Sequence, residues 1–134
     1  GAARSIVLAE WAGYVYRPGF VIAIDGETRA IVLALRGSVE LQDALTDFCC
    51  EHEACEAMGM TGIGHSGMLR SARALSETVL PVIAGLLQSD KYRDFTLVLT
   101  GHSLGAGVAA ILAALWLTSP TLPLWDGGSR LRCF

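Results

Sequence analysis

The residues with the clearest chemical potential are Gly101-His102-Ser103-Leu104-Gly105, which fit the pattern G-x-S-x-G. A serine hydroxyl can attack an ester carbonyl when a base accepts its proton and hydrogen-bond donors stabilise the resulting oxyanion. Because a short pattern matches many sequences by chance, the flanking residues decide what this one means. Residues 95–100 form an apolar run rich in β-branched types, which predicts a buried strand, and residues 108–117 predict a helix.

The order strand, sharp turn and helix is the context that a nucleophile elbow requires. Gly101 and Gly105 leave room where a Cβ would collide with backbone, so Ser103 can adopt a strained conformation and project above the strand ends. The positive end of the helix and the backbone N–H of Leu104 then face the oxyanion, whereas His102 should point away from Ser103. The alternative interpretation is a glycine-rich turn in which Ser103 only caps the following helix.

A second candidate lies where another apolar strand ends. Residues 30–35 are continuously apolar, which is typical of a strand buried on both faces, and Arg36-Gly37-Ser38 ends it. The backbone N–H of Ser38 is therefore placed to be a second oxyanion donor, with its hydroxyl as a third. The alternative is that Ser38 simply caps the next helix.

The elements around these two turns follow from hydrophobic spacing and from glycine and proline positions. We expect a helix at 2–12, a strand at 20–25, a hairpin turn at 25–28, a short amphipathic helix at 40–48, an irregular segment at 49–64, a long helix at 68–88 that Pro81 kinks or interrupts, a turn at 125–128 and a strand that begins at 131. This order predicts an α/β fold, a mixed sheet flanked by helices. Because the last strand is unfinished, we expect the fold to be truncated after the elbow helix.

Composition bounds the class of protein. The 134 residues suffice for one domain, 1–134, and 52% of them are hydrophobic against 17% charged, which argues against disorder. The formal net charge is −3 and Lys91 is the only lysine, which argues against nucleic acid as a partner. No signal peptide is visible, and the apolar run 104–117 is shorter than a membrane span, so we expect a soluble chain.

The sequence has four cysteines, Cys49, Cys50, Cys55 and Cys133. They lack the C-x-x-C spacing that is typical of a zinc site. A metal patch that uses His52 between Cys50 and Cys55 is the alternative to free thiols. We therefore expect no metal and no cofactor, and the thiol usage favours the cytoplasm.

A gate is one expected role of the segment 49–64 before the long helix. The apolar residues of 40–48 share one helical face, and the following stretch mixes methionines with glycines, which is typical of a mobile loop. A plain surface excursion explains the same composition, and Asp43 and Asp47 are expected to be structural. The candidate gate residues of that stretch are Met58 and Met60, and the apolar residues that precede it are Val39, Leu41, Leu45 and Phe48.

Four segments of the sequence, namely 31–38, 43–47, 64–68 and 101–112, resemble motifs of one family. They occur in the same order in the class 3 lipases, the fungal triacylglycerol lipase-like α/β-hydrolases. Together they resemble this family over most of the chain, and most closely its sn-1-specific diacylglycerol lipase branch. The resemblance implies that Ser103 is the nucleophile and that Ser38 and Leu104 form the oxyanion hole. It also implies that 39–48 corresponds to the fungal lid, that 49–64 corresponds to the regulatory insertion of the diacylglycerol lipases, and that His65 is structural.

The family supplies its catalytic aspartate and histidine after the elbow. In this sequence Asp126 follows Ser103, but no histidine follows Asp126. A serine without a base is a poor nucleophile. We therefore expect the chain to be the N-terminal portion of a hydrolase domain and inactive on its own.

The predicted function is that of a serine lipase that cleaves fatty-acyl esters of acylglycerols, with diacylglycerol as the expected substrate. Such a lipid substrate implies work at a membrane surface, on its cytoplasmic side. The alternatives are a catalytically silent lipase-like module that binds lipid or protein, and a phospholipase, galactolipase or acyltransferase of the same fold. Acyl-chain preference, calcium dependence and oligomeric state stay open at this point.

Overall fold

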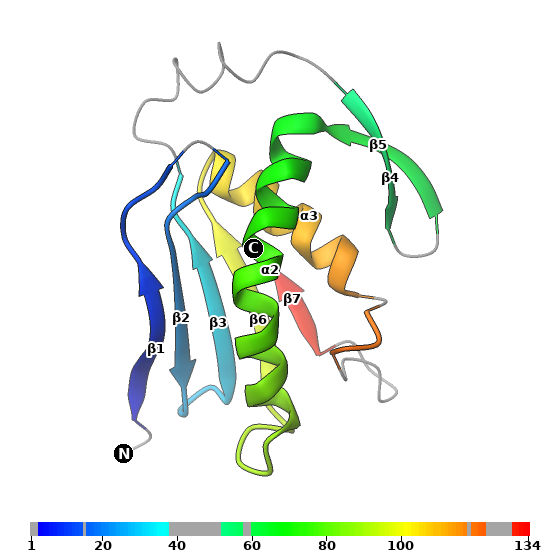
Figure 1. The fold of residues 1–134 in the computed structure, drawn as a ribbon. Helices are drawn as coiled ribbons and strands as arrows, with labels where there is room; N and C mark the ends of the chain where they lie inside the picture. The colour runs from blue at the N-terminus through cyan, green and yellow to red at the C-terminus, as the bar shows by residue number, and fades with distance from the viewer. Residues whose placement is uncertain (1–2, 15, 38–51, 58–59, 118, 123–129) are drawn as a thin grey trace.

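The structure is a computed structural model that describes residues 3–14, 16–37, 52–57, 60–117, 119–122 and 130–134, with the backbone alone for 52–57 and 60–66. The strands and helices in chain order are β1 (Arg4–Glu10), β2 (Phe20–Asp25), β3 (Ala30–Leu35), β4 (His52–Ala57), β5 (Met60–His65), α2 (Ser66–Gln88), β6 (Thr96–Gly101), α3 (Leu104–Trp116) and β7 (Leu131–Cys133). Figure 1 shows α2 and α3 on one face of a twisted sheet, with β4 and β5 as a separate ribbon beside them. The expected α/β architecture is confirmed.

The main sheet of the described residues has five strands in the order β1-β2-β3-β6-β7. The first three are antiparallel neighbours, whereas β3, β6 and β7 run parallel. Parallel neighbours need a crossover connection, which α2 provides between β3 and β6 and α3 provides between β6 and β7. The carboxyl ends of β3 and β6 therefore meet at one edge of the sheet, where Leu35 is paired with Gly101.

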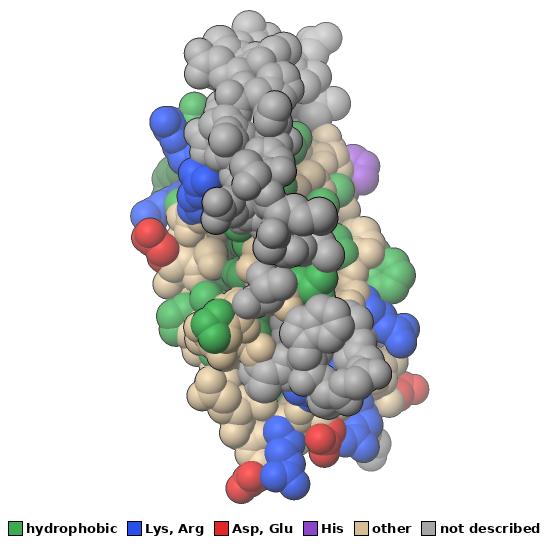
Figure 2. Space-filling view, turned by 90° about the vertical axis from the view of Figure 1, so that its right-hand side faces the viewer, with side chains coloured by type: hydrophobic (Ala, Val, Ile, Leu, Met, Phe, Trp, Pro, Cys, Tyr) green, Lys and Arg blue, Asp and Glu red, His purple; other side chains and the backbone are tan. Residues whose placement is uncertain are grey.

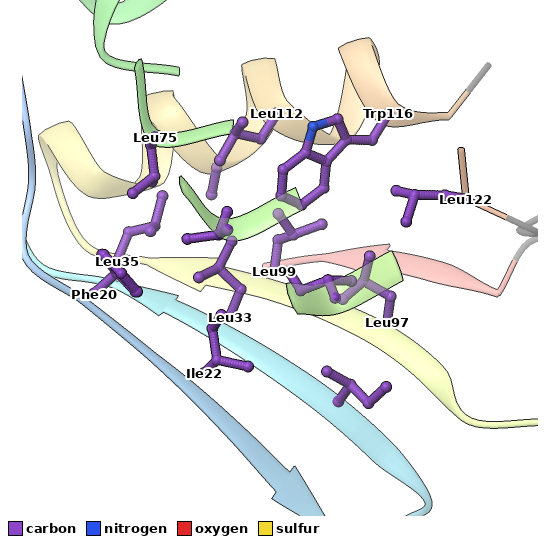
Figure 3. Packing of buried hydrophobic residues seen from close by; sticks show 14 of the residues in the cluster. Phe20, Ile22, Leu33, Leu35, Leu75, Leu97, Leu99, Leu112, Trp116 and Leu122 are labelled. Carbon is purple, nitrogen blue, oxygen red and sulfur yellow. The ribbon is translucent and has the colours of Figure 1, made fainter. Parts of the chain in front are cut away.

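The core lies between the helices and one face of the sheet. Alternate residues of the central strands are fully buried because each strand presents every second side chain to the helices. Figure 3 shows Leu112 and Trp116 of α3 directed toward Leu97 and Leu99 of β6. The Trp116 indole Nε1 also donates a hydrogen bond to Ser76 Oγ at 2.8 Å, which joins α3 to α2.

The expected helix at 2–12 is wrong, because residues Arg4–Glu10 form strand β1. Ile6, Val7 and Trp11 follow helical spacing, but their side chains are exposed, so the spacing marks no buried helical face. Ile6 and Val7 are β-branched, which favours a strand, and β1 pairs with β2 with one register shift between Ile6 and Leu8. Strand pairing therefore overrides the local pattern.

The segment expected to be irregular contains an antiparallel pair, β4 and β5, in which His52 is paired with His65. Helix α2 begins at Ser66, two residues before the expected start, and continues through Pro81 without interruption. Pro81 is exposed, so the carbonyl that loses its hydrogen-bond donor there can face solvent. The helix expected at 40–48 and the turn expected at 125–128 lie outside the described residues.

No helix in the described part of the chain is long and apolar enough to cross a bilayer. Figure 2 shows acidic and basic side chains at the lower end of the molecule, and a further group at the upper left of the view. Ion pairs lie at the lower end, among them Arg29 with Asp94 at 4.0 Å and Arg93 with Asp90 at 3.7 Å. All four side chains are exposed, so these pairs contribute little to stability.

We predict that Leu99→Ala lowers the free energy of unfolding by about 2–5 kcal/mol, because it leaves a cavity in a fully buried position. Denaturant unfolding followed by circular dichroism measures the change. Ile6→Ala is the matched control, since Ile6 is 61% exposed, and it should change stability by no more than about 0.5 kcal/mol. Equal losses for the two variants would contradict the described core.

Candidate active site

Ser103 lies between the end of β6 and the start of α3 in a conformation that few residues adopt. Its φ is 56° and its ψ is −122°, and a positive φ is costly for a residue with a Cβ. The side chain is exposed and makes no capping hydrogen bond to α3. The alternative interpretation, a serine that only caps the helix, is therefore wrong, and the hydroxyl remains available for other chemistry.

Two glycines make this turn sterically possible. A Cβ added to Gly101 would lie 2.5 Å from the carbonyl oxygen of Gly105 and 2.7 Å from the backbone nitrogen of Ala106. A Cβ added to Gly105 would lie 2.7 Å from the carbonyl oxygen of Leu35 and 3.0 Å from that of Arg36. All four atoms belong to backbone and cannot rotate away, so both positions require glycine, as the sequence predicts.

The end of β3 meets the same turn. A Cβ added to Gly37 would lie 2.5 Å from the carbonyl oxygen of His102, so the backbone after β3 passes directly against the elbow. The His102 side chain is exposed. Ser38, the expected second oxyanion donor, follows Gly37 in the sequence but lies outside the described residues.

The N-terminus of α3 begins immediately after Ser103, four residues before the expected start at Val108. The N–H of Gly105 donates to the His102 carbonyl at 3.0 Å, and the N–H of Ala106 donates to the Ser103 carbonyl at 3.0 Å. The N–H of Leu104 has no hydrogen-bond partner in the part of the chain that the structure describes. It is thus a free donor at the positive end of a helix, beside the Ser103 hydroxyl.

One contact near the elbow was missed from the sequence. A Cβ added to Gly107 would lie 2.6 Å from the Met68 sulfur, so the first turn of α2 packs on the first turn of α3. The available signal was the second glycine of the Gly105-Ala106-Gly107 stretch, which marks a close approach on a helix. Because the thioether is the flexible end of a side chain, this contact tolerates change better than those of Gly101 and Gly105.

Other expected site residues are not brought to the serine by the described structure. Val39, Leu41, Leu45, Phe48 and Met58 lie outside the described residues, and Met60 is placed only by its backbone at the start of β5. Within the described part of the chain, no hydrogen bond joins the Ser103 hydroxyl to a histidine, and no group of three His, Cys, Asp or Glu side chains could hold a metal ion.

We predict that Gly101→Ala lowers the free energy of unfolding by at least about 2 kcal/mol, because the new Cβ collides with the Gly105 backbone. Gly85→Ala is the matched control: a Cβ at this exposed position in α2 meets nothing within 4 Å. The control should raise stability by about 0.5–1 kcal/mol through helix propensity. Denaturant titrations of the two variants give the comparison, and a Gly101→Ala protein as stable as Gly85→Ala would refute the close approach.

Comparisons with known proteins agree with this geometry. The family model for lipase (class 3) matches residues 32–134. Diacylglycerol lipase-alpha of Rattus norvegicus is 34% identical over 139 residues, which cover 98% of this chain and 12% of that protein. Diacylglycerol lipase-beta of Mus musculus is 37% identical over 117 residues, which cover 84% of this chain and 17% of that protein. The chain therefore spans only a small part of the curated relatives it matches.

The fold also matches solved structures of lipases. A triacylglycerol lipase from Penicillium expansum superposes with a TM-score of 0.71 at 25% identity, covering 87% of this chain and 47% of that one. The family model covers most of the chain, and its match begins within β3 and includes the elbow and α3. By sequence and by fold, the chain belongs to the class 3 lipase family.

Proposed function

We propose that the protein is a serine ester hydrolase that releases fatty acid from acylglycerols, with Ser103 as its nucleophile. The observation that carries this proposal is the strained backbone of an exposed serine whose hydroxyl caps nothing. Two glycines that tolerate no Cβ hold it there. A fold rarely maintains such strain without a use for it, and membership of a lipase family supports ester cleavage as that use.

In the proposed reaction the Ser103 oxygen attacks the acyl carbonyl while a base accepts the serine proton. The tetrahedral intermediate collapses, the ester bond breaks and the glyceride leaves with that proton, which produces an acyl-enzyme. Water then attacks the acyl-enzyme, releases the fatty acid and regenerates the serine. The base and its carboxylate partner are expected outside the described residues.

The oxyanion is proposed to lie against two backbone donors. The N–H of Leu104 supports this role because it has no partner within the described chain and stands at the positive end of α3. Ser38 is proposed as the second donor, since Gly37 already contacts the elbow backbone. Fixed donors of this kind stabilise the charge that develops in the transition state more than the neutral ester.

Diacylglycerol is the proposed substrate because two relatives above 30% identity are named diacylglycerol lipases. A gate formed by the segments 39–48 and 49–64 is proposed to control access, with Val39, Leu41, Leu45, Phe48, Met58 and Met60 as its apolar residues. Such a substrate places the reaction at a membrane surface, and the proposed compartment is the cytoplasmic side.

We predict that Ser103→Ala in the intact protein lowers the rate of diacylglycerol hydrolysis by about 10⁵-fold or more, because the covalent step is lost. Ser5→Ala is the matched control: Ser5 is exposed on β1, so its replacement should leave the rate unchanged. Release of free fatty acid measures both rates. Hydrolysis that survives in Ser103→Ala would refute the nucleophile, and a folded wild-type protein without hydrolase activity would favour the silent module.

A backbone substitution tests the role of Leu104. Replacing Leu104 by its α-hydroxy acid through protein semisynthesis removes only the N–H and keeps the side chain. We predict a loss of about 10²–10³-fold in kcat with a similar KM, because the donor acts mainly on the transition state. The same replacement at Ala110, inside α3, is the control for helix disruption. Equal effects at the two positions would contradict an oxyanion role for Leu104.

A further inference from the structure

The loop between β1 and β2, residues 11–19, lies at the same end of the sheet as Ser103. The Arg36 side chain, which follows β3, donates a hydrogen bond from Nη1 to the Trp11 carbonyl at 3.2 Å. The Arg36 carbonyl in turn lies against Gly105 of the elbow. A short chain of contacts therefore runs from Trp11 through Arg36 to the turn that holds the serine.

Two aromatic side chains project from this loop. Trp11 is 66% exposed and Tyr14 is 69% exposed, although large aromatic side chains are normally buried. Backbone hydrogen bonds of 2.8 and 2.9 Å between Tyr14 and Arg17 fix the loop, and Gly19 packs closely against the carbonyl groups of Glu10 and Trp11. These backbone contacts hold the described part of the loop with both rings outward, and such preorganisation lowers the entropy lost on binding.

Three arginines belong to this loop or to the segments that contact it. Arg17 and Arg36 are exposed, and the Arg70 guanidinium of α2 lies 4.7 Å from the centre of the Tyr16 ring. Guanidinium groups bind phosphate through paired hydrogen bonds. The opposite end of the molecule differs, because there Arg29 is paired with Asp94.

The loop also borders an apolar cavity of about 220 Å³. Its apolar wall includes Trp11, Phe20, Val21 and Leu35, and its charged lining residues are Arg36 and Glu10. Aromatic rings, arginines and an adjoining apolar cavity match the layered chemistry of a phospholipid surface, in which acyl chains lie beneath phosphates.

We propose that the loop 11–19 is a membrane-docking surface. Trp11 and Tyr14 enter the headgroup region of a phospholipid bilayer, and Arg17, Arg36 and Arg70 bind lipid phosphates. Docking in this way brings the elbow to the bilayer, where an acylglycerol would be found. The inference rests on the proposed function in one respect, since it takes the substrate to be a membrane lipid.

The test uses co-sedimentation with phosphatidylcholine vesicles, which offer phosphate without net charge. This lipid suits the chain because residues 38–59 are acidic and would oppose binding to an anionic bilayer. The double variant Trp11→Ser/Tyr14→Ser should weaken vesicle binding by about tenfold or more. Ile6→Ser is the matched control, since Ile6 is 61% exposed on the same edge of the sheet but away from the loop, and binding should change by less than about twofold.

A second matched pair tests the cations. Arg17→Gln should weaken vesicle binding by about fivefold, whereas Arg93→Gln at the opposite end should not. Wild-type protein that does not sediment, or a double variant that binds like wild type, would overturn the docking surface. A dimer that Trp11→Ser/Tyr14→Ser dissociates, without vesicle binding, would assign the loop to a second copy and overturn it equally.

Hydrolysis of a water-soluble, monomeric ester separates this inference from the proposed function. Intact protein that cleaves the soluble ester but does not bind vesicles would refute docking and leave Ser103 as the nucleophile. Intact protein that binds vesicles through Trp11 and Tyr14 but cleaves no ester would support docking and refute the hydrolase.

Discussion

The close approach of two backbone segments at the elbow is the constraint on which the site depends. Gly101 and Gly105 are in contact through backbone atoms, and neither has room for a Cβ. Because the chain closes so tightly around it, Ser103 must adopt a positive φ, and α3 must begin at the very next residue. The exposed hydroxyl of Ser103 and the Leu104 N–H, which has no partner among the described residues, are therefore consequences of one steric contact.

The parallel pair β3 and β6 determines what surrounds that contact. Their pairing aligns Leu35 with Gly101, so the backbone after β3 reaches both Gly105 and His102. The same strand end holds the β1–β2 loop through Arg36. Segments far apart in the sequence thus meet at one end of the sheet, while exposed ion pairs occupy the other end. The proposed docking surface and these ion pairs therefore lie at opposite ends of the sheet.

The strands β2, β3 and β6 could be predicted from sequence because each is a continuous apolar run bounded by glycine or a polar turn. The elbow could be predicted because its two glycines and its serine follow such a strand. The strand β1 could not, since its pairing with β2 outweighs the helical spacing of Ile6, Val7 and Trp11. The sequence predicts the start of α3 too late because Gly105 and Gly107 are poor helix formers, although the backbone of Leu35 and Arg36 leaves room only for glycine at position 105. Neither the contact of Met68 nor the exposure of Trp11 is encoded locally.

Covalent labelling tests the central claim most directly. A fluorophosphonate reacts with a serine whose hydroxyl is activated and whose oxyanion hole is formed, so it reports the chemistry without requiring a lipid. Intact protein would be treated with the probe, digested and mapped by mass spectrometry. The proposed mechanism predicts a single adduct on the peptide that contains Ser103, and none in the Ser103→Ala protein. An adduct on another serine, or active protein without one at Ser103, would contradict it.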